Sequence, residues 1–350
     1  MIKSMWLFRS NLRPLEYYHQ FKSLEEFNED CHDFYLMQGM WYLENGYLDE
    51  FVVWRLAPKN IQYKHVLSYE LPNGSKFKQL FVNSFNDIFT KHNEVTPMIT
   101  LFRGGFPEYD QILSSNKNAF GTTLYLAAGK RTTPQYGGVY DRILVESNEH
   151  LQSIKNSIPF YKTCNPNVFF QTMKMENVYD IIFPSNFTQR TYKGQEFFIK
   201  QMSKSSDLLQ HLNIVHIGNK PEIGKEICRR YGITNLKFGG YKNRNIINTM
   251  LNKSKFGIIC SNKTDGCPRV ITEIMASGTP LLIREETKLL DYYKSMSSVL
   301  VFNKSNMMDV IDEAINDYEY YKEEAIKNLQ KISMDKICDM NWKEWTKKTA

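Results

Sequence analysis

Two carboxylates at a fixed spacing are the side chains best suited to chemistry. Asp265 and Glu273 have seven residues between them, within the segment 255–283. Asp265 lies in a polar loop that follows an apolar run, and a carboxylate there faces the crevice at the carboxyl ends of parallel strands, where open α/β sheets bind ligands. Glu273 lies about one turn inside the helix that follows, placed to accept hydrogen bonds from vicinal hydroxyls, as acids do on nucleotide riboses. The free N–H groups at the start of that helix suit a diphosphate.

The elements around these acids read as strand, loop, helix and strand. Residues 255–260 are an apolar run of strand length, residues 261–268 are a polar loop, and residues 269–277 carry apolar side chains at helical spacing. Gly278 stands where a helix C-terminus favours a positive φ. A second apolar run follows at residues 281–283. This order predicts a βαβ unit, which requires parallel strands and a right-handed crossover.

This constellation resembles the signature of retaining GT-B glycosyltransferases of family 4, the glycosyl transferases group 1. The family carries an acid, seven residues, a glutamate and then Ala-x-Gly-x-Pro, which Asp265, Glu273 and residues 276–280 match. The first acid is Asp where the family usually has Glu, so its reach differs. The resemblance implies that Asp265 contacts the transferred sugar and that Glu273 binds the donor ribose. The donor-binding residues that it implies are Gly194, Tyr241, Gly266, Cys267, Pro268 and Glu273.

A pair of cations follows the apolar run at residues 178–183. Retaining GT-B enzymes place an Arg and a Lys-Gly after the first strand of the second domain, and Arg190 and Lys193-Gly194 match them by type, at a slightly tighter spacing. The resemblance implies that Arg190, Lys193 and Asp265 are the catalytic residues. The two cations would hold the donor diphosphate and stabilise it as a leaving group, a role for which no metal ion is expected.

Two further loops in the first half place small residues beside cations. Arg103-Gly104-Gly105 follows a strand predicted at residues 98–102, and Gly129-Lys130-Arg131 follows one at residues 123–127. Both loops suit anion contact at the carboxyl edge of a sheet. If this half is the acceptor domain, the residues facing the cleft are Gly104, Gly105, Lys130 and Arg131. The usual Gly-Gly loop after the family's first strand is absent here, so its role stays unassigned.

The chain has 350 residues, which favours two domains over one. Strands that alternate with helices predict an α/β fold, and the resemblance implies GT-B, with two Rossmann-like domains facing a central cleft. We expect an acceptor-side domain at residues 1–165, a nucleotide-sugar-binding domain at 166–330, and a C-terminal helix at 331–350 that crosses back to the first domain. We also expect a linker at residues 162–177 and one long helix at 307–330.

The composition bears on the cellular compartment and on the possible binding partners, but it does not identify the substrate. The chain has no run of about 18 apolar residues, no secretory leader pattern, and six scattered cysteines that fit reduced thiols in the cytoplasm. Its net charge is +6 and its pI is about 8.8. This mild excess of positive charge is compatible with nucleotide-sugar diphosphates, with peripheral contact to an anionic membrane, and with nucleic acid.

The resemblance implies a retaining hexosyltransferase that moves a sugar from a UDP- or GDP-linked donor to an acceptor hydroxyl, with no cofactor besides this co-substrate. The acceptor stays open between a glycan, a lipid-linked sugar, a small molecule and a modified DNA base. Two alternatives also stay open. One is a nucleotide-sugar 2-epimerase of the same architecture. The other is a non-catalytic nucleotide- or nucleic-acid-binding protein, which the Asp substitution and the missing Gly-Gly loop keep in view.

Overall fold

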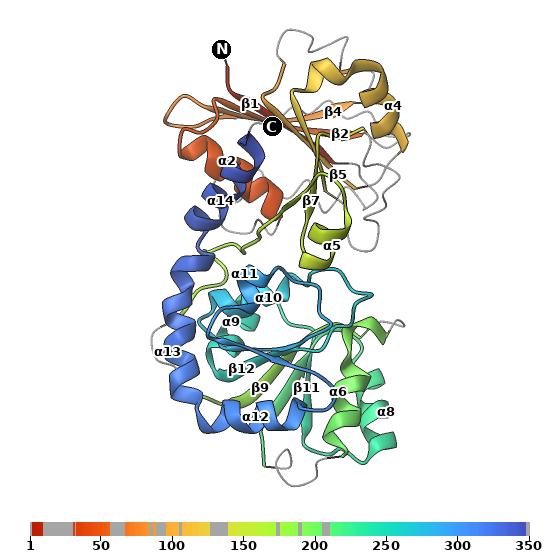
Figure 1. The fold of residues 1–350 in the computed structure, drawn as a ribbon. Coiled ribbons are helices and arrows are strands. Elements are labelled where there is room, and N and C mark those ends of the chain that lie inside the picture. Colours follow the sequence, from red (N-terminus) through yellow and green to blue (C-terminus); the bar gives the residue numbers. More distant parts are fainter. Residues whose placement is uncertain are drawn as a thin grey trace. The chain divides into compact units, whose positions relative to one another are not determined.

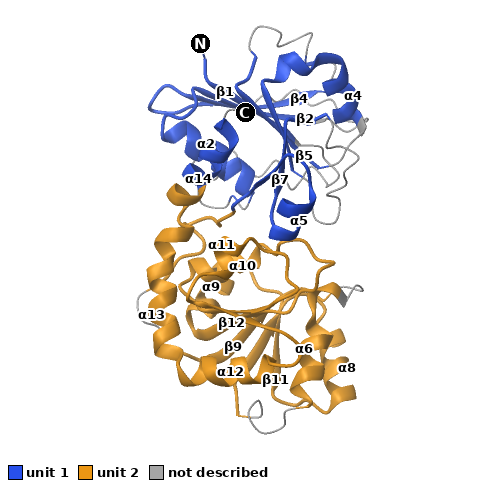
Figure 2. Cartoon of the chain, in the orientation of Figure 1, with its two compact units in different colours: residues 1–161, 338–350 blue, residues 162–337 orange. Residues whose placement is uncertain are grey.

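The structure is a computed structural model that divides into two compact units, coloured separately in Figure 2. Unit 1 is Met1–Tyr161 with Cys338–Ala350, and unit 2 is Lys162–Ile337. The residues that the structure describes are 2–9, 31, 33–56, 67–82, 84, 87–88, 96–104, 107–126, 139–172, 176–187, 191–204 and 211–347.

Unit 1 is built on an eight-stranded sheet within the described residues (Figure 1). Every neighbouring pair is parallel except β3 with β4, which is antiparallel. In spatial order the strands are β3 (Leu67–Glu70), β4 (Lys76–Val82), β2 (Glu50–Leu56), β1 (Ser4–Arg9), β5 (Ile99–Arg103), β6 (Thr122–Leu126), β7 (Arg142–Val145) and β8 (Ser157–Pro159).

Of the helices described in unit 1, α2 (Phe34–Glu44), α4 (Pro107–Asn116) and α5 (Asn148–Ser153) connect strands of this sheet. A further helix, α14 (Met334–Thr346), follows the last strand of the chain, and most of it belongs to unit 1. α2 begins at Phe34 because Asp33 caps it by accepting from Tyr35 N–H at 3.2 Å.

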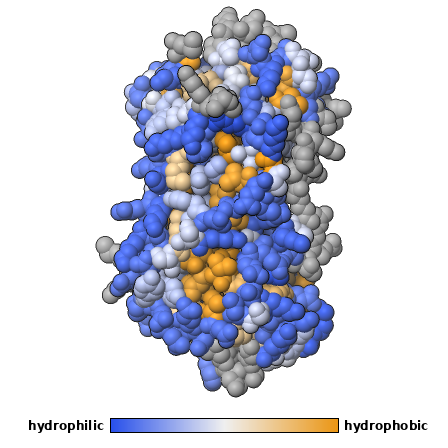
Figure 3. All heavy atoms as spheres, viewed as in Figure 1, coloured by the Kyte–Doolittle hydropathy of each residue, from blue (hydrophilic) through white to orange (hydrophobic). Residues whose placement is uncertain are grey.

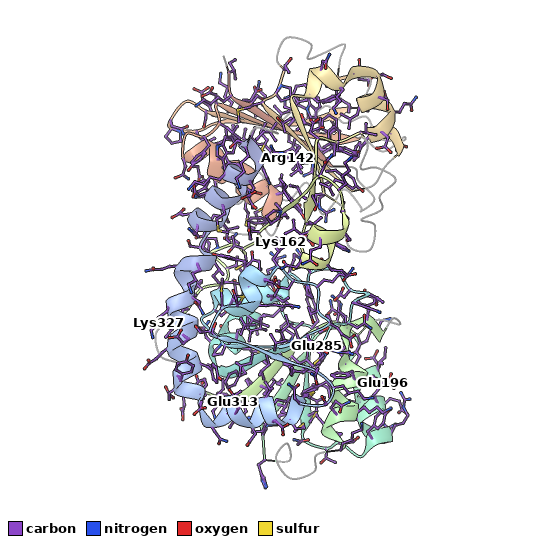
Figure 4. All side chains as sticks on the ribbon, viewed as in Figure 1. Arg142, Lys162, Glu196, Glu285, Glu313 and Lys327 are labelled. Carbon is purple, nitrogen blue, oxygen red and sulfur yellow. The ribbon has the colours of Figure 1, made fainter. Side chains whose placement is uncertain are left out.

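The C-terminal part of α14 belongs to unit 1 and packs against α2. Trp342 lies 4.8 Å from the Tyr42 ring, and the buried Trp345 stacks on Phe160 at 6.1 Å. Arg142 of β7, labelled in Figure 4, donates hydrogen bonds to the backbone carbonyls of Glu344 and Lys347 at the end of this helix. The helix end is therefore held by ring packing and by a cation at its carbonyl groups.

Unit 2 is built on a six-stranded, fully parallel sheet within the described residues. In spatial order the strands are β11 (Leu236–Gly240), β10 (Ile214–Ile217), β9 (Tyr179–Pro184), β12 (Ser254–Ile259), β13 (Leu281–Arg284) and β14 (Val299–Phe302). This is the doubly wound order of a Rossmann-like domain. The predicted alternation of strands with helices is confirmed in this unit.

The helices described in unit 2 are α6 (Gln195–Met202), α8 (Pro221–Tyr231), α9 (Arg244–Asn252), α10 (Val270–Ala276), α11 (Asp291–Lys294), α12 (Met307–Asn316) and α13 (Tyr318–Asn328). The single helix predicted over residues 307–330 was wrong. Asp317 has φ −103° and ψ 24°, which ends α12 one residue before α13 begins. A 3₁₀ turn, Leu329–Ile332, then follows α13.

The segment expected as a linker, residues 162–177, belongs to unit 2, so that prediction was wrong for its described part. Tyr293 Oη accepts from Lys162 N–H at 2.7 Å and donates to Lys162 O at 2.6 Å. Thr163 Oγ1 donates to Ile332 O at 2.6 Å. Polar side chains of unit 2 thus satisfy the backbone of this segment, which a composition-based prediction could not show.

The face of the molecule in Figure 3 is mainly hydrophilic, with smaller groups of hydrophobic residues on both units. No helix among the described residues has the length and apolar character needed to span a membrane.

Candidate donor site in unit 2

The centre of the candidate site is the pair of neighbouring strands β9 and β12. The sheet order runs outward from β9 through β10 on one side and from β12 through β13 on the other. The loops after these two strands therefore leave a shared crevice at their carboxyl ends, the position at which doubly wound sheets bind ligands. Lys193 follows β9, and Asp265 follows β12.

The structure brings these two predicted residues into contact. Lys193 Nζ donates to Asp265 Oδ2 at 2.8 Å. The lysine side chain is 25% exposed and the aspartate side chain is 11% exposed, so the pair is largely shielded from water. A charge-assisted hydrogen bond in such surroundings fixes both side chains more firmly than one on an open surface.

Gly194 allows the two loops to approach this closely. Its φ is +75°, and a Cβ built on it would lie 1.9 Å from Cys260 O. Only glycine avoids both the left-handed strain and this collision. Beside it, Asn262 N–H donates to Tyr192 O at 2.9 Å, which joins the loop after β12 to the 3₁₀ turn Thr191–Lys193. The backbone therefore sets the distance between Lys193 and Asp265.

Ser261, which the sequence analysis missed, fixes the orientation of the Asp265 carboxylate. Its Oγ donates to Asp265 Oδ2 at 2.8 Å, and its own carbonyl accepts from Thr287 Oγ1 at 2.9 Å. Asp265 N–H also donates to Asn262 O at 3.0 Å. Ser261 is the second residue after β12, at the carboxyl edge of the sheet, and this position was the signal that could have identified it.

Glu273 lies on α10, which begins at Val270 as the spacing predicted. Desolvation raises the pKa of its carboxyl group, while the positive charges of Arg269 and Arg244 partly lower it. Arg244 is the first residue of α9 and directly follows the loop after β11. The sequence analysis missed this arginine, although its place after a strand at the same sheet edge could have suggested it.

The end of α10 explains the Ala-x-Gly-x-Pro part of the motif. Gly278 has φ +67°, as predicted for this position, and a Cβ there would lie 3.1 Å from Gln171 Cγ. Pro280 O accepts from Gly257 N–H at 2.9 Å in the adjacent strand β12. Tight packing of the helix end therefore holds α10 against the sheet and keeps Glu273 in place.

The remaining predicted donor residues lie in loops at the same sheet edge. Tyr241 follows β11 and is 71% exposed. Gly266 and Cys267 are half-buried and Pro268 is buried, all between β12 and α10. Burial lowers the pKa of Lys294, and the negative charges of Asp291, Glu285 and, least of the three, Cys267 partly raise it. These loops offer backbone groups and one exposed ring, but their contacts with a donor stay a prediction.

Several predicted residues lie elsewhere. Arg190, Gly105, Lys130 and Arg131 are outside the described residues. Gly104 belongs to unit 1, where its φ is +97° and its N–H donates to Leu126 O at 3.0 Å. This bond ties the end of β5 to the neighbouring strand β6.

Residues 165–331 match the family model of the glycosyl transferases group 1. No curated protein sequence matches the chain significantly.

Solved structures match over nearly the whole chain at low sequence identity. Sucrose-phosphate synthase from Thermosynechococcus elongatus superposes with a TM-score of 0.64 and 10% identity, covering 97% of this chain and 98% of its own. A glycosyltransferase from Rickettsia africae gives 0.65 and 15%, covering 98% of each chain. The Anabaena protein HepE in complex with UDP gives 0.64 and 11%, covering 98% of this chain and 99% of its own. The chain therefore has the GT-B fold, with two Rossmann-like units, and its residues 165–331 resemble the glycosyl transferases group 1.

Proposed function

We propose that this protein is a retaining glycosyltransferase that moves a hexose from a nucleoside diphosphate donor to an acceptor hydroxyl. Unit 2 binds the donor and unit 1 binds the acceptor. In the reaction the bond between the anomeric carbon and the diphosphate oxygen breaks, and a bond from the acceptor oxygen to the same face of that carbon forms. The hydroxyl proton leaves with the diphosphate.

One observation carries this proposal: the contact of Lys193 with Asp265 at the central crevice of unit 2. It joins the two halves of the predicted motif at the point where the doubly wound topology predicts a ligand. It also lies within the segment that matches the glycosyl transferases group 1.

Lys193 supplies the charge that the leaving group needs. A diphosphate gains negative charge as the glycosidic bond breaks, and a preorganised cation stabilises that charge most strongly where water is excluded. Asp265 balances the ammonium before the donor arrives. When the donor binds, its diphosphate replaces Asp265 as the partner of the Lys193 ammonium group. Asp265 can then accept hydrogen bonds from the hydroxyls of the transferred sugar. We propose that Arg190 assists, so that no metal ion is required.

Glu273 selects the nucleoside. Its carboxylate accepts hydrogen bonds from the ribose hydroxyls, and the loop carrying Tyr241 meets the base. Burial raises the pKa of Glu273, and the positive charges of Arg269 and Arg244 partly offset this effect. The charged carboxylate is the form that accepts hydrogen bonds from both ribose hydroxyls. A structural neighbour with UDP bound supports a UDP-linked donor as the first choice, with GDP second.

All six cysteines are free thiols, which supports a reducing compartment, and we place the reaction in the cytoplasm.

A thermal-shift screen of UDP, GDP, ADP, CMP and their sugar conjugates tests the proposal. A ligand that binds only the folded protein raises its melting temperature, so one diphosphate and its sugar conjugate should do so selectively. The shift, and later the turnover, should persist in EDTA. No shift with any nucleotide would contradict the proposal.

A further inference from the structure

The neighbouring strands β9 and β12 (Figure 1) are bridged by two Lys–Asp pairs, one at each end. At the amino ends, Lys255 Nζ lies 2.8 Å from Asp180 Oδ1. Asp180 Oδ2 accepts from Asn213 N–H at 2.8 Å, so both oxygens of this carboxylate have a donor. Beyond the carboxyl ends, Lys193 Nζ lies 2.8 Å from Asp265 Oδ2. The first pair is therefore an internal reference for the second, with the same charges and the same distance.

Asp265 leaves one of its oxygens for a ligand. Lys193 Nζ and Ser261 Oγ both donate to Oδ2, each at 2.8 Å. Among the residues that the structure describes, none donates to Oδ1. A carboxylate oxygen that is largely shielded from water is stabilised by a hydrogen-bond donor, and a ligand in the crevice of unit 2 can supply one. The pair at the amino ends is thus complete, whereas the pair in the candidate site is not.

A sugar hydroxyl is the donor that fits Asp265 Oδ1. In the proposed function the nucleotide sugar brings two groups to this pair: a diphosphate for the Lys193 ammonium and hydroxyls for the Asp265 carboxylate. The nucleoside diphosphate that remains after transfer brings only the first. Its phosphate oxygens give Asp265 no hydrogen bond, and their charge repels the carboxylate. Donor and product therefore differ in what they offer to Asp265, and not in what they offer to Lys193.

The backbone prevents Asp265 from withdrawing when a diphosphate takes its lysine. Asp265 N–H donates to Asn262 O at 3.0 Å, and Ser261 O accepts from Thr287 Oγ1 at 2.9 Å. The carboxylate then stays near the diphosphate, with Ser261 Oγ as its remaining donor within the described residues. A shielded carboxylate that loses its cation is strongly unfavourable. The hydroxyls of an intact donor offset this penalty, and the product has no group that does so.

We infer that Asp265 discriminates between donor and product: it favours binding of the nucleotide sugar and opposes binding of the free nucleoside diphosphate. This role rests on the proposed function and adds to it a means of product release. Lys193 is the group for which the carboxylate and the diphosphate compete. Ser261 is a positioning residue, because its hydroxyl holds the carboxylate whether or not Lys193 is paired with it.

Calorimetric titration of the full chain with UDP and with UDP-glucose tests this role; GDP and GDP-glucose replace them if the thermal-shift screen selects guanosine. Asp265→Asn keeps the size of the side chain and an oxygen that accepts from Ser261, but it removes the competing charge. UDP should therefore bind at least about threefold more tightly to this variant than to the wild type. UDP-glucose should gain less affinity or lose some, because its hydroxyls lose a charged acceptor.

Ser261→Ala should act in the opposite direction. The carboxylate beside bound UDP then has no donor among the described residues, so UDP should bind at least about threefold more weakly, and UDP-glucose should lose less. In the Asp265→Asn background the same substitution should change little, because the charge that Ser261 stabilises is absent. Asp180→Asn and Ser254→Ala are the matched controls, since both residues lie at the amino ends of β9 and β12, and they should leave both affinities unchanged.

Three results would overturn the role of Asp265. One is a UDP affinity that is unchanged or lower in Asp265→Asn. Another is an equal gain for UDP and UDP-glucose, and the third is an equal gain in Asp180→Asn, which would show an effect of net charge alone. If Asp265→Asn does not fold, Ser261→Ala decides, because equal losses for the two ligands would overturn the role. Failure of the proposed function is separate, since it appears as absent binding of every nucleotide to the wild type.

Discussion

Lys193 Nζ and Asp265 Oδ2 are 2.8 Å apart although 72 residues separate them in the chain. The bond is possible because β9 and β12 are neighbours in the sheet and because Gly194 lets their loops touch. It gives the ammonium group of Lys193 a counter-ion within unit 2, which the donor diphosphate replaces in the function that we propose. The predictions for unit 2 follow from this pair.

Replacing Lys193 by alanine should lower kcat on the order of 10²–10³-fold, because the departing diphosphate loses its preorganised cation. KM for the donor should change less, since the charge on the diphosphate grows in the transition state. Steady-state kinetics with the donor found by thermal shift measure both constants. Lys200→Ala, on the exposed side of α6, is the control. Equal kcat in the two variants would remove Lys193 from the mechanism.

Gly194→Ala should be far more damaging than Gly232→Ala, although both residues have nearly the same backbone conformation. Their φ values are +75° and +70°, so both variants suffer left-handed strain of about 1 kcal/mol. A Cβ at Gly232 has no neighbour within 4 Å, whereas at Gly194 it would lie 1.9 Å from Cys260 O. We expect Gly194→Ala to separate the two loops and abolish turnover, and Gly232→Ala to stay active.

Denaturant unfolding of these two variants supplies the matching stability measurement. Gly194→Ala should lower the free energy of unfolding by clearly more than Gly232→Ala does. Similar losses in both would show that the loops of the candidate site can move apart at little cost.

His216 should make the protein less stable in mild acid. It is 1% exposed on β10, its ring lies 4.5 Å from that of Phe187, and burial lowers its pKa to about 4. Unfolded histidine has a pKa of about 6.5, so between these values the unfolded state binds the extra proton and stability falls with falling pH. From about pH 7 to about pH 5 the loss should be roughly 2 kcal/mol.

The variant His216→Phe should flatten this pH dependence, because phenylalanine keeps the ring packing and does not titrate. His211→Phe is the control, since His211 is exposed in the segment before β10. Urea titrations at several pH values measure the slopes. An unchanged slope in His216→Phe would assign the acid sensitivity to other groups.

Trp345→Ala should destabilise unit 1 by about 3–5 kcal/mol, the range for deleting a large buried aromatic side chain. Trp345 is buried against Phe160, whereas Trp342 is partly exposed, so Trp342→Ala should cost less. Thermal unfolding measures the difference in stability between the two variants. It is followed by far-ultraviolet circular dichroism, because the variants themselves remove tryptophan. Equal losses would mean that the end of α14 is held mainly by the carbonyl contacts of Arg142.

The sequence predicted the elements of unit 2 best where apolar periodicity was strong. The strand–loop–helix–strand unit at β12, α10 and β13 was placed to within about one residue at each boundary. The break at Asp317 was missed because α12 and α13 share one continuous apolar pattern, and only the backbone angles of this residue reveal the turn.

The candidate site was predicted by residue type but not by contact. Sequence spacing identified Lys193, Asp265 and Glu273, yet it could not show which strands become neighbours. That information decides that Lys193 meets Asp265, that Ser261 orients the carboxylate, and that Arg244 acts on Glu273.

The most direct test of the account is the affinity of the selected nucleoside diphosphate for wild type, Glu273→Gln and Glu323→Gln, measured by calorimetry. Glu323 is an exposed glutamate of α13 and serves as the control. We predict that Glu273→Gln raises Kd at least about tenfold, because a carboxylate bound to ribose hydroxyls is lost, while Glu323→Gln leaves Kd unchanged and both variants melt as the wild type does. An unchanged Kd in Glu273→Gln would contradict the donor site proposed for unit 2.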